Sequence, residues 1–417
     1  MFKDKQIFSW AMYDWANSAF ATTILSAILP IYFSKVLASD LSPQNATVYW
    51  SYTISIALLI TALISPVIGA VSDYTNRKKL FLKICAGIGI LFTGFLYFTK
   101  TGDWLMASFF FIIANSGYSL SLIFYDSLLG FIAKRDEIDR VSTFGYALGY
   151  LGGGLLLAVN LLMFSIFKDS SFAARLSFLS VAVWWAIFSI PLFINVPETK
   201  IFNKIENENY LKVGFKRVKT TFTDIRQYRD LFIFLIAFWI YNDGIGTIIK
   251  LAAIYGSELG ISATSLIGAL LVTQFVGIPF SIFFGTLSVH LGAKKCIYIG
   301  LLVYTLISIG AFFITNAYHF WILAIMVGTV QGGTQALSRS LFASMVPKSN
   351  SAEFFGFYGM SSKFAGIAGP LIFAVVNQMT GSSRLSIISL IIFFIAGIAM
   401  LTFVDEKEGG RIASLKG

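Results

Sequence analysis

The chain has 417 residues, of which 57% are hydrophobic and only 12% are charged, and its formal net charge is +10 at pH 7. Soluble globular proteins carry about 25% charged residues, so this composition excludes a chain that keeps most of its surface in water. The basic residues lie between apolar runs rather than on one soluble face. We therefore interpret them as signals of membrane topology and expect no nucleic-acid partner.

Twelve apolar runs are long enough to cross a bilayer as helices, which takes about 20 residues each. The first run continues well past the length of a signal-peptide core, so we expect it to be an uncleaved span. The sequence thus predicts an all-α integral membrane protein with twelve transmembrane helices. These runs begin near Phe8, Ala46, Leu80, Trp104, Val141, Phe172, Leu231, Ser262, Cys296, Phe320, Phe354 and Leu385.

The loops between the runs predict the orientation and the domains. Most Lys and Arg residues fall in loops on the side of the N-terminus, which places both termini in the cytoplasm by the positive-inside rule. We expect a monomeric, multi-pass protein of the cell membrane, taking the chain to be prokaryotic. Its expected parts are an N-terminal six-helix bundle (1–196), a cytoplasmic linker (197–230), a C-terminal six-helix bundle (231–404) and a cytoplasmic tail (405–417).

The linker contains an amphipathic pattern. Its apolar residues recur at spacings of four and three, and basic residues cover the other face, which predicts a helix lying on the inner leaflet and tethering the two bundles. These apolar residues are Leu211, Phe215, Val218, Phe222 and Ile225.

The two halves of the chain repeat each other. Gly69 and the basic run 77–79 near the end of the second span are matched by Gly285 and Lys294-Lys295 near the end of the eighth. Two such six-helix halves form the parallel-repeat plan of alternating-access transporters, in which the substrate binds near the midplane between the halves. The sequence therefore predicts two pseudo-symmetric bundles around a central site.

The stretch from Gly69 through Asp73 to Arg77-Lys78-Lys79 resembles the signature loop of the major facilitator superfamily. The resemblance implies a cytoplasmic gate in which Asp73 lies close to an Arg of a following cytoplasmic loop, here Arg140. A carboxylate at a helix end can also meet the positive N-terminus of another helix. The alternative is that the basic triplet only fixes topology.

Four longer stretches narrow the resemblance. They resemble the "unknown major facilitator" branch related to the autophagy-related vacuolar amino-acid effluxer, which implies movement of a small solute such as an amino acid, with export as the expected direction. The four stretches are YDWANSAFATTI (13–24), FGYALGYLGGG (144–154), QGGTQALSRSLFASMVP (331–347) and EFFGFYGMSSKFAGIAGP (353–370).

Six charged residues fall within predicted spans, where each costs on the order of 2.5–3.5 kcal/mol at the centre of the bilayer. We set Glu258 and Glu353 aside as interfacial. We expect Asp126 and Arg339 to pair across the halves when the cytoplasmic side closes, and Asp243 and Lys363 to flank the central site, which would suit a zwitterion. The alternative is a set of structural ion pairs. The six residues are Asp14, Asp126, Asp243, Lys250, Arg339 and Lys363.

Amides inside the spans also favour a polar cavity, although each alone is explained equally well by an interhelical hydrogen bond. The amides expected on the pathway are Asn17, Asn115, Gln331 and Gln335, with Asn242 and Gln274 further candidates. Gly366, Gly369 and Pro370 predict close packing or a bend in the eleventh span.

No ATP-binding P-loop or hydrolase motif occurs, and Cys85 and Cys296 form no metal or redox motif. We therefore expect neither an enzyme nor a cofactor or metal site. The prediction is a secondary active transporter coupled to an ion, for which we favour the proton, with Asp126 and Asp243 as candidate carriers. A carrier of a sugar, nucleoside or other organic solute is the alternative, and a non-transporting membrane receptor is a further one.

Overall fold

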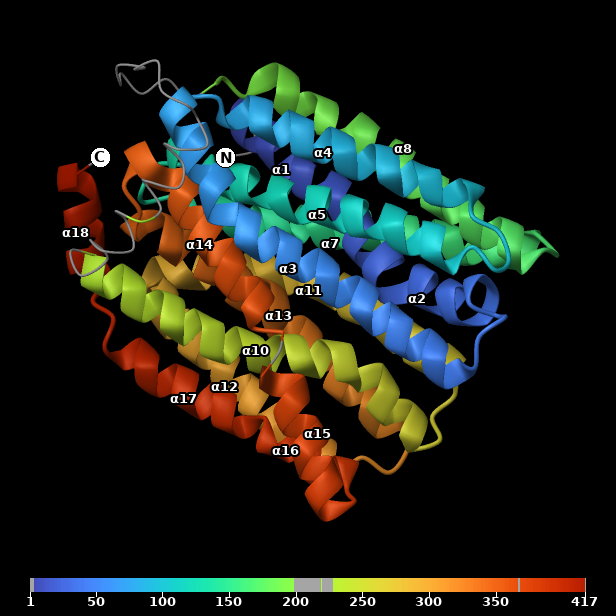
Figure 1. The fold of residues 1–417 in the computed structure, drawn as a ribbon. Coiled ribbons are helices and arrows are strands. Elements are labelled where there is room, and N and C mark those ends of the chain that lie inside the picture. Colours follow the sequence, from blue (N-terminus) through green and yellow to red (C-terminus); the bar gives the residue numbers. More distant parts are fainter. Residues whose placement is uncertain (1–3, 199–218, 220–227, 367, 417) are drawn as a thin grey trace.

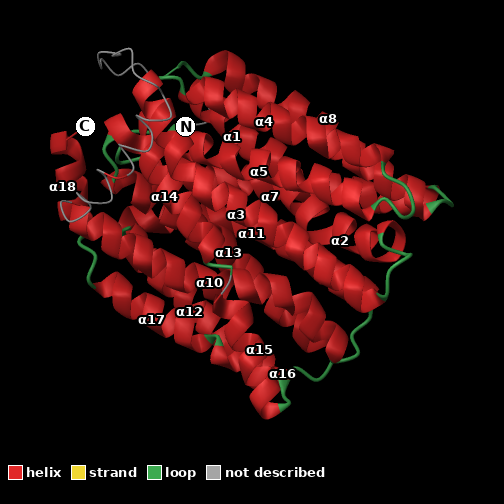
Figure 2. Cartoon of the chain, in the orientation of Figure 1, coloured by secondary structure: helices red, strands yellow, loops and turns green. Residues whose placement is uncertain are grey.

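The computed structural model describes residues 4–198, 219, 228–366 and 368–416. This part of the chain is built of helices joined by short loops (Figure 2). The amphipathic helix predicted around Leu211–Ile225 lies outside the described residues.

Twelve helical segments in the described residues are long and apolar enough to cross a membrane, as predicted. Most begin within about one helical turn of the predicted start, whereas the eleventh begins at Lys348, earlier than the predicted Phe354. The six spans of the first half are α1, η1, α2 and η2 together (Lys5–Ala19, Phe20–Ala27, Ile28–Tyr32, Phe33–Leu37), α3 (Pro43–Thr75), α4 with η3 (Lys78–Phe95, Leu96–Phe98), α5 with α6 (Trp104–Ser127, Leu129–Ile132), α7 (Ile138–Ile166) and α8 (Ser170–Asn195).

The second half repeats this plan and ends in one additional helix. Its spans are α10 (Arg229–Glu258), α11 (Ala263–Leu291), α12 (Ala293–Phe312), α13 (Ala317–Met345), η5 with α14 and α15 (Lys348–Asn350, Ser351–Phe364, Ala368–Thr380) and α16 with α17 (Ser383–Ser389, Ile391–Thr402), followed by α18 (Glu406–Lys416).

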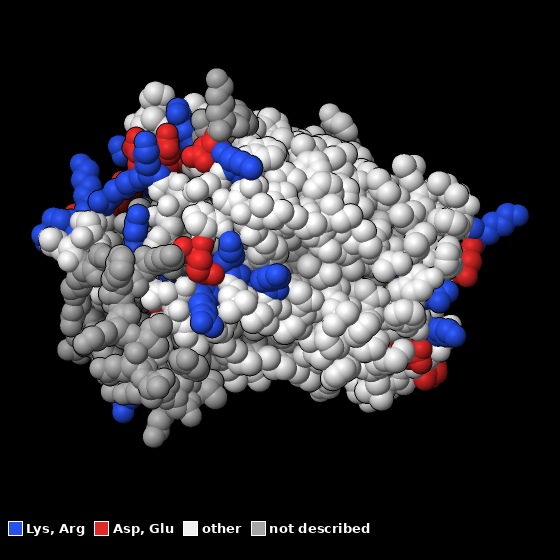
Figure 3. Space-filling view, turned by 90° about the horizontal axis from the view of Figure 1, so that it is seen from above, with Lys and Arg blue, Asp and Glu red and all other residues white. Residues whose placement is uncertain are grey.

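The two halves lie side by side with their helices running in a common direction (Figure 1). The pairs α3–α14 and α7–α11 pack against each other across the halves. The first and last helices, α1 and α18, both have their outer ends at the same end of the bundle, which we call the termini side. We call the opposite end the far side. Charged side chains gather at these two ends and leave an uncharged band between them (Figure 3).

The helices begin where the sequence supplies caps. Ser42, Asp169, Ser262 and Asn316 each accept a backbone N–H from the first turn of the helix that follows, which satisfies an otherwise unpaired donor. The turn between α3 and α4 is only two residues long. Asn76 makes it possible by adopting a left-handed conformation with φ of 54°, which asparagine tolerates better than most residues.

The structure adds two features that the sequence did not specify. The bend predicted in the eleventh span is a break, because α14 ends at Phe364 and α15 begins at Ala368. The predicted tail contains the helix α18, which packs against α13 and α10. Asp405 caps α18 by accepting the N–H groups of Glu408 and Lys407 at 3.1 and 3.0 Å, and these hydrogen bonds, the one from Glu408 foremost, hold the pKa of Asp405 below its usual value.

Candidate functional site

A cavity of about 150 Å³ lies between the halves, near the middle of the spans. It is lined by polar residues of both halves, with one acid (Asp126) and one base (Lys363) in its wall. No ion pair within 4.0 Å joins these two side chains in the described part of the chain. The polar lining residues are Ser119, Asp126 and Tyr146 from the first half, and Asn242, Gln335, Tyr358, Ser362 and Lys363 from the second.

Arg339 of α13 crosses to the first half beside this cavity. Its guanidinium contacts Asp126 Oδ1 at 3.1 Å and Asp14 Oδ2 at 3.2 Å, so the structure contains the pair predicted between Asp126 and Arg339 and adds a second acid to it. Arg339 also donates to the Ser142 hydroxyl at 2.9 Å and to the Ser142 carbonyl at 2.8 Å. One buried side chain of the second half therefore holds α1, α5 and α7 of the first.

Aromatic rings complete the surroundings of this guanidinium. The centre of the Arg339 guanidinium lies 4.5 Å from the Tyr146 ring, 5.0 Å from Trp10 and 5.5 Å from Tyr125, distances typical of cation–π contacts. Tyr125 also donates its hydroxyl to Asp14 at 2.7 Å. Because arginine stays charged and is weakly hydrated, it suits a site as buried as this one, where Arg339 is 3% exposed.

Two further hydrogen bonds cross the halves close to Arg339. Ser142 donates to the Ala336 carbonyl at 2.7 Å, and Ser340 donates to Asp139 at 2.5 Å. Together with the Arg339 contacts they join α7 to α13 on the termini side of the cavity. These contacts therefore hold the two halves together on the termini side.

The predicted gate residue Asp73 has partners other than the one expected. Its carboxylate pairs with Lys78 at 2.5 Å and accepts the N–H groups of Ala352 and Glu353, at 3.2 and 2.7 Å, at the start of α14. Arg77 and Arg140 are exposed instead. Among the described residues Asp73 thus forms no ion pair with Arg140, whereas a contact of its carboxylate with a helix N-terminus is present.

Two charged residues near the contact of Asp73 with α14 are buried. Lys78, the second residue of the basic triplet, is fully buried because it neutralises Asp73, so the triplet does more than mark topology. Glu353, which we expected at the membrane interface, is 0% exposed, because the first turn of α14 packs directly against α3.

Gly69 allows this close approach of α3 and α14. A Cβ atom at Gly69 would lie 2.3 Å from the Ala352 carbonyl oxygen, and one at Gly356 would lie 2.6 Å from the Ser65 carbonyl oxygen. Backbone atoms of the two halves are therefore in contact at the termini side, which only glycine permits.

We expect Gly69→Ala to open the termini side and to slow transport, because the added methyl group cannot fit against the Ala352 backbone. Overpacking of this kind costs about 1–3 kcal/mol. The measurement is the rate at which a thiol reagent labels a cysteine introduced at Ser351, the first residue of α14 on the termini side. The protein used for it contains no other cysteine. Gly87→Ala is the control, since nothing lies within 4 Å of its added Cβ; equal labelling in both variants would contradict the prediction.

Asp243 has a different position from the one predicted. It accepts the N–H groups of Ala368 and Gly369 at 3.1 and 2.9 Å and thereby caps the start of α15. It is buried and is absent from the lining of the central cavity. Asp243 does not flank that cavity opposite Lys363; it secures the break in the eleventh span.

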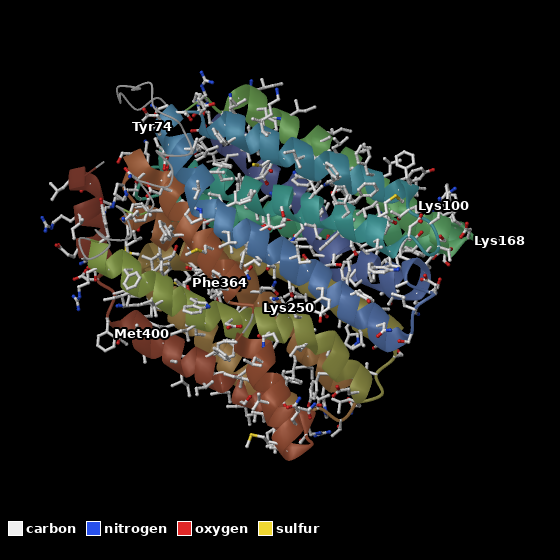
Figure 4. All side chains as sticks on the ribbon, viewed as in Figure 1. Tyr74, Lys100, Lys168, Lys250, Phe364 and Met400 are labelled. Atoms are coloured by element: carbon white, nitrogen blue, oxygen red, sulfur yellow. The ribbon has the colours of Figure 1, made fainter. Side chains whose placement is uncertain are left out.

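Lys250 lies on the same helix as Asp243 and near the same break. Its ammonium nitrogen is 2.6 Å from where a Cβ atom at Gly366 would lie. Lys250 appears halfway along the molecule, close to the end of α14 at Phe364 (Figure 4). It is exposed and does not line the central cavity.

Of the remaining residues predicted on the pathway, one lines the central cavity and the others do not. Gln335 lines the cavity, whereas Asn17, Asn115 and Gln331 do not. Asn17 is buried and donates to the Tyr13 carbonyl at 2.7 Å within its own helix, which is the structural alternative. Sequence reasoning missed Ser142 and the cavity residues Tyr146 and Tyr358, although Tyr146 and Tyr358 lie in two of the stretches that carry the family resemblance.

Together with this fold, the match to a family of effluxers and the similarity to an MFS-type transporter place the chain among transporters of small solutes of the major facilitator type, and not among enzymes. The structure is similar to that of the proton:xylose symporter XylE bound to 6-bromo-6-deoxy-D-glucose, with a TM-score of 0.74, 16% identity and coverage of 99% of both chains. Residues 42–139 and 132–414 match the family described as "Vacuole effluxer Atg22 like", and the chain belongs to this family.

Two relatives illustrate the range of the family. The chain is 39% identical to the uncharacterized MFS-type transporter YxiO of Bacillus subtilis (strain 168), over 98% of this chain and 97% of that protein. It is 27% identical to autophagy-related protein 22 of Yarrowia lipolytica, over 66% of this chain and 51% of that protein.

Proposed function

We propose that the protein exports a small zwitterionic solute, such as an amino acid, by alternating access. The observation that carries this proposal is the pair of opposite charges in the cavity wall, Asp126 from one half and Lys363 from the other. An ammonium group would contact Asp126 and a carboxylate would contact Lys363, both through charge-assisted hydrogen bonds. A solute that bridges the halves in this way would favour their closure around it.

The size of the cavity supports a small solute. Its volume of about 150 Å³ lies below the roughly 300–1,000 Å³ of typical drug-sized ligand sites. Export is supported by the family description, which names an effluxer. The positive-inside rule supports a cytoplasmic termini side, so the closed end of this conformation would face the cytoplasm.

We propose the proton as the coupling ion and Asp126 as its carrier. Arg339 faces two carboxylates, Asp14 and Asp126, so this cluster holds one more negative charge than positive when both are ionised. Uptake of one proton would balance it. Asp126 is favoured over Asp14 because it also lines the cavity, where proton and solute would meet.

Replacing Asp126 and Asp243 separately by asparagine should distinguish a proton carrier from a helix cap. Asp126→Asn is expected to abolish acceleration of transport by a pH gradient while leaving solute exchange measurable. Asp243→Asn is expected to retain that acceleration but to lower the free energy of unfolding by about 1–3 kcal/mol, because an amide presents only one oxygen to the two N–H groups of α15. Proteoliposome transport and thermal unfolding measure the two effects; the reverse assignment would contradict the carrier role of Asp126.

The test of the whole proposal is counterflow in proteoliposomes against a panel of labelled amino acids, with and without a pH gradient. Saturable exchange that responds to the gradient is the expected result, and reconstitution in known orientation gives the direction. Exchange of a sugar or nucleoside with no exchange of any amino acid would overturn the zwitterion and leave the transporter class intact.

A further inference from the structure

A second, larger cavity of about 340 Å³ opens on the termini side, beyond the Arg339 cluster. Three separate parts of the chain line it: the end of α5 with the loop before α7, the segment from α13 to α14, and the helix α18. It is distinct from the central site, with which it shares only Phe355.

The charged residues that line this cavity are all basic. Lys134 and Arg135 come from the first half and Lys348 from the second, and no acidic residue is among the described lining residues. Within the described chain, none of the three has an acidic partner within 4.0 Å. Lys348 is held toward the cavity by the ring of Phe131, whose centre lies 5.7 Å from its ammonium nitrogen.

A buried hydroxyl in the same wall lacks a partner. Ser351 is 5% exposed, lines the cavity, and its Oγ makes no hydrogen bond to the described residues. The other lining serines donate to carbonyls of their own helices, Ser127 to Phe124, Ser344 to Leu341 and Ser414 to Arg411. A buried polar group without a partner costs about 1–3 kcal/mol, which a ligand accepting its hydrogen would recover.

The helix α18 leaves room for the Arg135 side chain at this cavity. A Cβ atom at Gly410 would lie 1.6 Å from Arg135 Nη2 and 3.4 Å from the Ser344 carbonyl oxygen. Gly410 therefore gives room for the guanidinium to lie between α18 and α13. Arginine at this place offers the planar pair of donors that suits a phosphate group.

We propose that this cavity binds a phosphate group, with Lys134, Arg135, Lys348 and the Ser351 hydroxyl as its donors. Because these residues come from both halves, the site is complete only while the termini side is closed. Bound phosphate therefore stabilises the closed conformation and slows transport. The group comes either from a soluble phosphate compound or from the headgroup of an anionic lipid.

The test uses the full-length protein in phosphatidylcholine nanodiscs, with labelled inorganic phosphate in equilibrium dialysis. We expect saturable binding of one phosphate per chain, weakened about tenfold or more in Lys348→Ala and in Arg135→Ala. Lys407→Ala, which removes an exposed charge from α18 outside the cavity, is the matched control and should bind as the wild type does. Unchanged thermal unfolding without phosphate verifies that the variants are folded.

A second arm separates the two sources of phosphate. Nanodiscs that contain phosphatidic acid are expected to suppress the binding of inorganic phosphate if the headgroup occupies the site, and to leave it unchanged if the ligand is soluble. Absence of saturable binding together with no effect of phosphatidic acid on thermal unfolding would overturn the proposal. Equal binding by the wild type and Lys348→Ala would overturn it as well.

Discussion

Replacing Arg339 by leucine is expected to abolish transport and to lower the free energy of unfolding by about 3–5 kcal/mol. Arg339 is only 3% exposed, and its removal leaves the carboxylates of Asp14 and Asp126 without their cation in the interior. It also removes the two hydrogen bonds from Arg339 to Ser142 and thus weakens the contact of α13 with α7. Thermal unfolding in detergent and solute exchange in proteoliposomes measure the two losses.

Two comparisons identify the cause of this loss. Arg411→Leu, which removes an exposed arginine with a partner on its own helix, should leave both measurements unchanged. Adding Asp14→Asn and Asp126→Asn to Arg339→Leu should restore part of the stability, because the unpaired charges are gone, but not transport. Normal exchange by Arg339→Leu would show that the cluster plays no part in the cycle.

Replacing Lys363 by alanine is expected to weaken solute binding roughly 10–100-fold while the protein stays folded. A hydrogen bond between charged groups contributes about 1.5–3 kcal/mol, which corresponds to this change in affinity. Lys363 lines the central cavity and has no acidic partner within 4.0 Å among the described residues, so its removal leaves no protein carboxylate unpaired. The concentration dependence of counterflow gives the change in affinity.

Lys250→Ala is the matched control, because Lys250 also lies within a span but does not line the cavity. We expect its solute affinity to stay within a few-fold of the wild type, and Lys363→Arg to retain part of the affinity by keeping the charge. Unchanged affinity in Lys363→Ala would rule out a carboxylate contact at this residue and favour an uncharged solute.

The features that depend on composition and repetition were predictable from the sequence. Twelve spans follow from the length of the apolar runs, since a bilayer demands about 20 apolar residues for each. The contact between Asp126 and Arg339 followed from the cost of leaving each charge alone in the membrane. The division into domains at 197–230 stays a prediction.

The features that depend on the rotation of helices about their axes could not be predicted. The sequence could not decide which member of 77–79 turns inward, and the structure buries Lys78 and exposes Arg77. The sequence placed Asp243 in the correct span but did not predict that it caps α15. That helix begins only at the break after Phe364, which the sequence pattern did not specify. The cavity residue Tyr146 was overlooked because aromatic residues are common throughout the spans.

The break in the eleventh span has a mechanical consequence. A continuous helix would act as a rigid rod, so that movement at one end would displace the other. Here α14 is fastened to α3 through Gly69 and Asp73, while α15 is fastened to α10 through Asp243. The two segments are therefore held in place by different helices. Because of this separate fastening, a change in the position of α15 need not be passed on to α14.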